Sequence, residues 1–135
     1  METPESLDWV TARSKCSLAA VFETLMEVLD SDVKSRNALG AQGVRFLLTR
    51  PVGQKLIVVR ERDFGGIPET DTVVFELTKA HVAATARNAR GDGKPLFQAK
   101  PALNREGDCL LEVNGEELRL WQVSRLALEG LFFGF

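Results

Sequence analysis

The sequence has few of the residues that build metal sites, redox centres or general bases. Its 135 residues include two cysteines, one histidine and no tyrosine. A single histidine excludes sites that need several imidazole ligands, and Cys16 and Cys109 stand in no metal-binding or redox spacing. We therefore expect no metal, no other cofactor and no disulfide scaffold. Such cysteine content is typical of a reducing compartment.

Long hydrophobic segments and a strong excess of basic charge are also missing. No stretch approaches the roughly 20 apolar residues of a membrane span, and no basic start with a following apolar run predicts a signal peptide. The net charge is −2, although segments 44–62 and 79–105 are basic. Nucleic-acid-binding domains are usually basic overall. We predict a cytoplasmic protein with neither a membrane nor a nucleic acid as partner.

The composition that remains is that of a globular protein. Apolar residues make up 44% of the chain and charged residues 27%, which excludes disordered and fibrous classes. A chain of this length fits one domain, residues 1–135, and is long enough to bury a core without added cross-links.

The first half of the chain predicts two helices followed by three strands. A short helix carries Trp9 and Val10, and Ser14 or Ser17 caps a longer helix over about 17–38. Apolar residues recur there at spacings of three and four, namely Leu18, Val21, Phe22, Leu25 and Leu29. They form the single stripe of a helix packed on a larger body. Strands are expected at 44–50, 55–62 and 72–78, the second of them apolar on both faces and so central in the sheet.

Residues 79–90 suit either a helix or a strand. Val82 and Thr85 favour a strand, whereas five alanines, Thr78 as N-cap and Gly91 as a stop favour a helix. We predict a helix.

The clearest local signal is Asn114-Gly115, the preferred pair of a two-residue type I′ hairpin turn. Pairing outward from this turn places Leu111 opposite Leu118 on a buried face, and Glu112 opposite Glu117 on an exposed face. A short strand is expected at 96–100, before the hairpin.

Ser124 is expected to cap a closing helix formed by the apolar tail, residues 126–135. The predicted fold class is α+β, with N-terminal helices, an antiparallel sheet of about five or six strands, and a middle and a C-terminal helix packed on one face. The expected order is α-β-β-β-α-β-β-α. This order resembles that of sterol-carrier-type lipid-binding domains, and equally that of small acidic secretion chaperones.

Two functions from different classes suit such a domain. The first is a non-enzymatic binding protein with a pocket for a small apolar or anionic ligand. Its candidate residues are the strand arginines, which can hold an anion bidentately, and aromatic residues near the mouth of the pocket: Arg60, Arg62, Arg119, Trp121 and Phe132. The second is a homodimeric interaction module that hides an apolar final helix in the dimer.

An enzyme is the third possibility, and its candidates are scattered along the chain. His81 is the one histidine available as a base, with Asp63 or Asp71 to orient it. Cys16 is the better candidate for a reactive thiol, because Cys109 falls on the predicted buried face of the hairpin. No catalytic constellation is apparent from the spacing of these residues.

Overall fold

The computed structural model describes residues 7–40, 42–51, 53–63 and 66–134, and the structural statements below concern these residues. They form an α+β fold in which two helices precede an antiparallel sheet and one helix follows it. The helices are α1 (Trp9–Ser14), α2 (Leu18–Leu39) and α3 (Leu120–Phe133). The strands are β1 (Val44–Thr49), β2 (Lys55–Asp63), β3 (Pro68–Leu77), β4 (Val82–Arg87), β5 (Gly93–Leu103), β6 (Cys109–Val113) and β7 (Glu116–Leu118).

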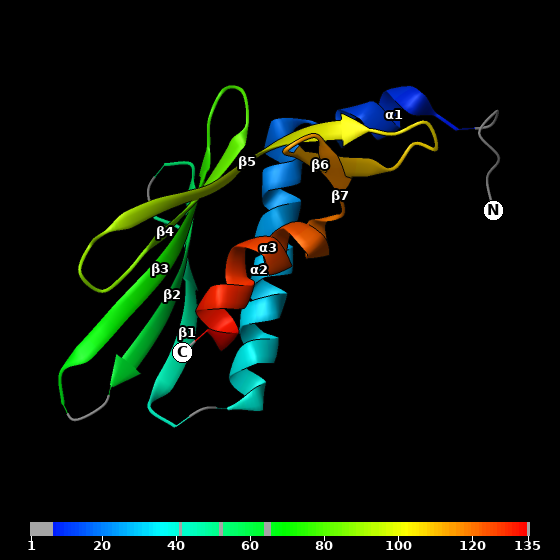
Figure 1. Ribbon diagram of the computed structural model, residues 1–135. Helices are drawn as coiled ribbons and strands as arrows, with labels where there is room; N and C mark the ends of the chain where they lie inside the picture. The colour runs from blue at the N-terminus through cyan, green and yellow to red at the C-terminus, as the bar shows by residue number, and fades with distance from the viewer. Residues whose placement is uncertain (1–6, 41, 52, 64–65, 135) are drawn as a thin grey trace.

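The seven strands form a meander in which each strand pairs antiparallel with the next one along the chain (Figure 1). The longest strand, β5, joins two parts of this sheet. Its first half pairs with β4, and its second half, Lys100–Leu103, pairs with β6. The β6–β7 hairpin therefore sits as a short annex at one end of the main sheet.

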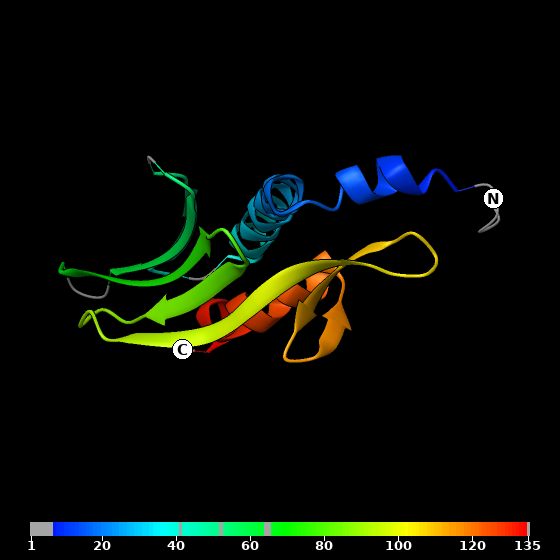
Figure 2. The same ribbon diagram turned by 90° about the horizontal axis from the view of Figure 1, so that it is seen from above.

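Helices α2 and α3 cover the same face of the sheet, which curls around them (Figure 2). The burial of β2 follows this arrangement: Leu56 and Val58 are buried against the helices, whereas Ile57 and Val59 are half-buried on the outer face. The strand predicted to be central, β2, is an interior strand but lies second from the β1 edge of the sheet, and no described helix covers its outer face.

The predicted stripe on the long helix is confirmed and forms the centre of the core. The Ser17 side chain caps α2 by accepting a hydrogen bond from the backbone N–H of Ala20. The largest buried side chains, Phe22 of α2, Phe46 of β1 and Phe75 of β3, join α2 to the sheet. Helix α2 is thus the element against which the strands pack.

The hairpin is also confirmed in its turn and its register. Asn114 and Gly115 have φ angles of 53° and 80°, the left-handed conformation that a type I′ turn requires at both positions. Leu111 pairs with Leu118 and Glu112 with Glu117.

The helix predicted for residues 79–90 is wrong, because this segment contains strand β4. Val82 and Ala84 are buried on its inner side, and β4 pairs with both β3 and β5. Thr78, expected to cap a helix, instead closes the β3–β4 turn: its Oγ1 accepts hydrogen bonds from the N–H groups of Ala80 and His81. Alanine favours helix by less than about 1 kcal/mol per residue, which two rows of strand hydrogen bonds outweigh.

Two further corrections concern the order of elements and the closing helix. The seven strands follow one another without a middle helix, so the expected order and strand count match only in outline.

Helix α3 begins at Leu120 rather than after Ser124, and the backbone N–H of Arg119 donates to Gln122 Oε1 at 2.8 Å. Ser124 is buried inside α3, where its hydroxyl donates to Asp32 of α2 at 2.5 Å.

The free edge of the sheet at β1 is covered by a side chain of α2. The Asn37 amide nitrogen donates to the Phe46 carbonyl at 2.8 Å, and its oxygen accepts from the Phe46 N–H at 3.0 Å. An amide side chain thus occupies the place that a neighbouring strand would take beside Phe46.

Candidate functional site

The end of α3 is held by two buried arginines, Arg36 of α2 and Arg60 of β2. Arg36 Nε donates to the Phe132 carbonyl at 2.9 Å, and Arg60 Nη1 donates to the Leu131 carbonyl at 2.8 Å. The last carbonyls of a helix lack partners within the helix and carry its partial negative charge. These two cations supply both the missing hydrogen bonds and the matching charge, so they fix where α3 ends.

Arg60 belongs to an ion-pair network that includes two other candidate residues. Asp71 Oδ2 lies 2.8 Å from Nη2 of Arg60 and 2.8 Å from Nη2 of Arg62. Asp71 Oδ1 accepts a hydrogen bond at 3.0 Å from the backbone N–H of Ala89, which follows β4. Both carboxylate oxygens of Asp71 are therefore engaged, and the network braces β2, β3, the β4–β5 turn and α3.

The proposed base follows one end of β3, whereas Asp63 lies beside the other end and Asp71 lies within the strand. Asp63 ends β2 and pairs with Pro68 at the start of β3, whereas His81 lies in the turn after β3 ends at Leu77. A ten-residue strand separates these ends, a distance of about 30 Å at the usual rise per residue. The structure does not bring His81 together with Asp63, and Asp71 is committed to its arginines.

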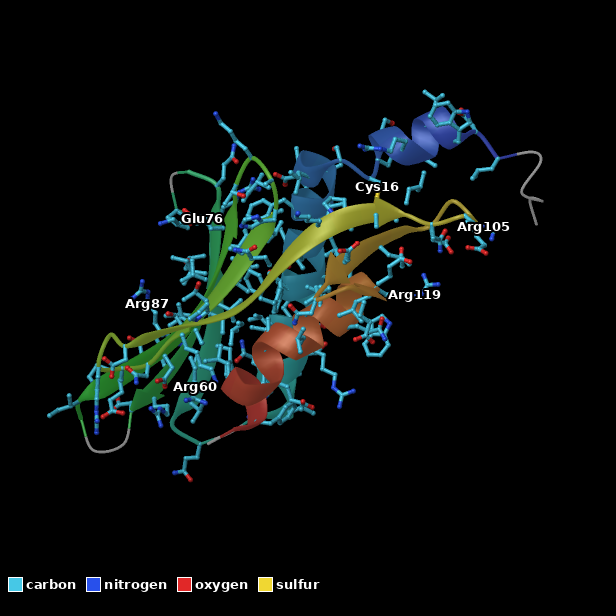
Figure 3. All side chains as sticks on the ribbon, turned by 45° about the horizontal axis from the view of Figure 1, so that its top comes forward. Cys16, Arg60, Glu76, Arg87, Arg105 and Arg119 are labelled. Carbon is cyan, nitrogen blue, oxygen red and sulfur yellow. A yellow bond between two sulfur atoms is a disulfide. The ribbon has the colours of Figure 1, made fainter. Side chains whose placement is uncertain are left out.

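The expectation that the two cysteines form no disulfide is wrong. They form a disulfide with a Cα–Cα distance of 5.4 Å that joins the start of α2 to the start of β6. Figure 3 shows Cys16 at the junction of α1 and α2, far from Arg60. Cys16 is buried and bonded, so it is not a free thiol nucleophile. The cysteines also give no support to a reducing compartment, and a cytoplasmic location stays a prediction.

The five candidate ligand residues fall in three separate places. Arg60 and Arg62 lie in the Asp71 network, and Arg119 forms a long ion pair with Asp108 at 3.8 Å. Trp121 and Phe132 lie on α3, where both border a groove against α2. The structure therefore places Trp121 and Phe132 in one groove, and Arg60 and Arg62 in one ion-pair network. Arg119 lies apart from both.

The groove that Trp121 and Phe132 border, called here the α2–α3 groove, has a volume of about 420 Å³. Its walls are mainly apolar and its rim carries both signs of charge. Asp32, Ser35, Arg36 and Leu39 contribute from α2, and Trp121, Ser124, Arg125, Leu128, Glu129, Phe132 and Phe133 from α3. Three of these apolar side chains are largely exposed: Leu39 at 70%, Phe133 at 61% and Trp121 at 57%. They project around the groove rather than closing over it.

A second hollow, called here the α3–sheet cleft, lies along the other flank of α3 and has a volume of about 430 Å³. Strands β3, β4 and β5 form one wall, and Leu126, Ala127, Gly130 and Leu131 of α3 form the other. Arg60 and Asp71 lie among its lining residues, and Arg87, Asp92 and Lys94 come from β4, β5 and the turn between them. The two hollows share no lining residue.

Sequence reasoning missed Leu39 in the groove and Lys94 in the cleft. Leu39 is the last residue of α2, and no periodic pattern marks an exposed apolar residue at a helix end. Lys94 faces the cleft because β5 shifts its register against β4 at a bulge, which no local signal in the sequence predicts.

The described part of the chain has no group of three or more histidine, cysteine or carboxylate side chains that could hold a metal ion. No helix in it is both long and apolar enough to cross a lipid bilayer. The chain gives no match to known protein families, to curated proteins or to solved structures. The two resemblances based on element order assumed a middle helix, which the structure replaces by β4.

Proposed function

We propose that this protein is a non-enzymatic interaction module that pairs with a second copy of itself through the outer face of α3. The proposal rests on one row of exposed side chains. Trp121, Arg125, Glu129 and Phe133 follow one another at intervals of four residues and form what we call the α3 row. Neighbours at this spacing lie one above the other on a helix, so the row forms a continuous stripe about 18 Å long that winds gradually around α3.

The order of residues in the α3 row is self-complementary. An aromatic residue stands at each end, and a cation and an anion stand between them. When two copies meet antiparallel about a two-fold axis at position 127, Trp121 faces Phe133 and Arg125 faces Glu129, and each contact occurs twice. A symmetric dimer needs a surface that matches itself in this way. Arg125 and Glu129 already pair within one chain at 3.2 Å, so both charges lie where a second copy can reach them.

The exposure of the apolar residues favours a protein over a small molecule in the α2–α3 groove. Seven large apolar residues of the described chain are exposed, and Leu39, Trp121, Leu126 and Phe133 among them belong to α3 or to the groove. A ligand that fills about 420 Å³ between the helices leaves the projecting rings in water. A protein surface of about 800 Å² per partner covers them, and concentrated exposed apolar area is typical of such interfaces.

Charge reversal tests the pairing directly. Arg125→Glu and Glu129→Arg each place like charges opposite one another twice in the dimer, and each is expected to weaken dimerisation about tenfold. The double variant restores the order of charges and should recover the wild-type dimer. Sedimentation equilibrium at several protein concentrations measures the dissociation constant.

A matched control is present on α2. Asp30 and Lys34 form an exposed ion pair with the same spacing, and their reversal should leave dimerisation unchanged because neither residue borders the groove. The proposal is overturned if the wild-type protein stays monomeric at submillimolar concentration, or if the double variant is as weak as the single ones.

A further inference from the structure

The α3–sheet cleft has the apolar surface that a small ligand needs. Val73, Ala86, Leu96 and Ala127 line it, and Leu126 lies at its rim with 52% of its surface exposed. Its volume of about 430 Å³ falls within the range of roughly 300–1,000 Å³ for small-molecule sites. The cleft can therefore take a short apolar chain.

Lys94 is the exposed cation that the sheet presents to the cleft. Lys94 pairs with Ala86 and Arg87 with Gly93, so the Arg87 side chain lies on the opposite face of the sheet. Arg60 and Asp71, inside the cleft, offset each other at 2.8 Å. Lys94 forms no ion pair with any residue that the structure describes. Its ammonium group is available to a ligand.

The helix end beside the cleft does not repel an anion. The C-terminal carbonyls of α3 carry partial negative charge, but Arg60 and Arg36 donate to the carbonyls of Leu131 and Phe132. Both cations are buried at that end, and they offset the negative end of the helix where it borders the cleft.

We infer that the α3–sheet cleft binds a small amphipathic anion. Its apolar chain lies along Leu96, Leu126 and Ala127, and its carboxylate is held by Lys94. Apolar contacts supply the larger part of the affinity and the charged hydrogen bond fixes the orientation of the ligand. Because the cleft and the α2–α3 groove share no residue, this site does not depend on the proposed dimer.

Sodium decanoate is a suitable probe, titrated by calorimetry and by NMR with the backbone amides assigned. We expect saturable binding, with the largest shifts at the amides of Lys94, Leu96 and Leu126. Lys94→Gln should weaken binding at least about tenfold, since it removes a hydrogen bond between charged groups. Lys94 is exposed, so the variant should fold as the wild type does.

Lys100→Gln is the matched control, because Lys100 is exposed on the same strand outside the cleft, and its affinity should stay within about twofold. Decan-1-ol should bind at least about tenfold more weakly than decanoate, because it keeps the chain and lacks the charge.

The inference is overturned by shifts at Trp121 instead of Lys94, by equal losses in both lysine variants, by equal binding of the alcohol, or by no saturable binding. Trp121→Ala, designed to abolish the dimer, should bind decanoate like the wild type, which separates the failure of either proposal from the other.

Discussion

Phe132 and Phe133 are neighbours at the end of α3, yet they belong to different environments. Phe132 is 7% exposed and packs edge-to-face on Phe46 with ring centroids 4.9 Å apart, whereas Phe133 is 61% exposed. The same contrast runs along the whole helix. Val123, Ala127 and Leu131 are buried, while the α3 row on the outer side is open to solvent. Helix α3 is apolar on nearly all sides, but only its inner side contributes to the core of its own chain.

The contrast between the two rings predicts the largest loss of stability when the buried ring of Phe132 is removed. Phe132→Ala should lower the free energy of unfolding by about 3–5 kcal/mol, because it leaves a cavity beside Phe46. Phe133→Ala should lower it by no more than about 1 kcal/mol, through the lost stacking of Arg36 on the exposed ring. Urea unfolding of both variants as monomers measures the difference. Equal losses would mean that the outer face is also part of the core.

The disulfide should have the next largest effect, at the end of the molecule opposite the buried arginines. Replacing Cys16 and Cys109 together by alanine removes a cross-link between residues 93 positions apart. We expect a loss of about 3 kcal/mol, because the unfolded chain regains its freedom. Adding a thiol reductant should shift the thermal transition of the wild-type protein in the same direction and leave the double variant unchanged. A wild-type transition insensitive to reductant would contradict the expectation.

A smaller effect of opposite sign is expected at the exposed glycine of α3, beside the α3–sheet cleft. A Cβ added at Gly130 meets nothing within 4 Å, so Gly130→Ala should stabilise the helix by about 0.5–1 kcal/mol. Gly134→Ala is the contrasting variant, because its Cβ would lie 2.5 Å from the Gly130 carbonyl oxygen, and it should not stabilise. Thermal unfolding compares the two, and a destabilised Gly130→Ala protein would show that this position needs glycine.

The smallest effect concerns an exposed contact between α2 and the sheet. The hydrogen bond from Arg50 lowers the pKa of Glu23 below its ordinary value of 4.5. The folded state therefore binds this proton less readily than the unfolded state does. The resulting stability is present above pH 4.5 and is lost as the pH falls through the lower folded pKa. Unfolding curves of wild type and Glu23→Gln should differ slightly at neutral pH and converge in acid, and a constant difference would refute the assignment.

The parts of the fold that depend on local chemistry were predictable. The Asn114-Gly115 turn fixes its own hairpin register, and the stripe of α2 needs only its own periodicity. Strand β4 was not predictable in this way, because its alanines prefer helix and its partners are separate strands. The disulfide, and the pairing of Asp71 with two arginines of β2, likewise depend on contacts between distant parts of the chain.

The α3 row shows how a wrongly predicted helix start hides an exposed surface. The four-residue spacing of Arg125 and Glu129 is apparent from the sequence. Ser124, however, looks like a helix cap, and a helix that starts there excludes Trp121. The structure starts α3 at Leu120, because the Gln122 side chain accepts from the backbone N–H of Arg119. This places Trp121 on the helix and completes the row.

The amide of Asn37 has a consequence for how copies of this chain can associate. A meander has two open edges, and an exposed edge invites strand exchange and fibril growth. At β1 a side chain already occupies the hydrogen-bonding groups of Phe46, so an incoming strand must first displace it. On the other side of the sheet β7 offers a template of three residues, and residues 93–99 of β5 pair only with β4. Strand addition is therefore opposed at the β1 edge beside Phe46, and copies that associate through their helices need not pair their sheets there.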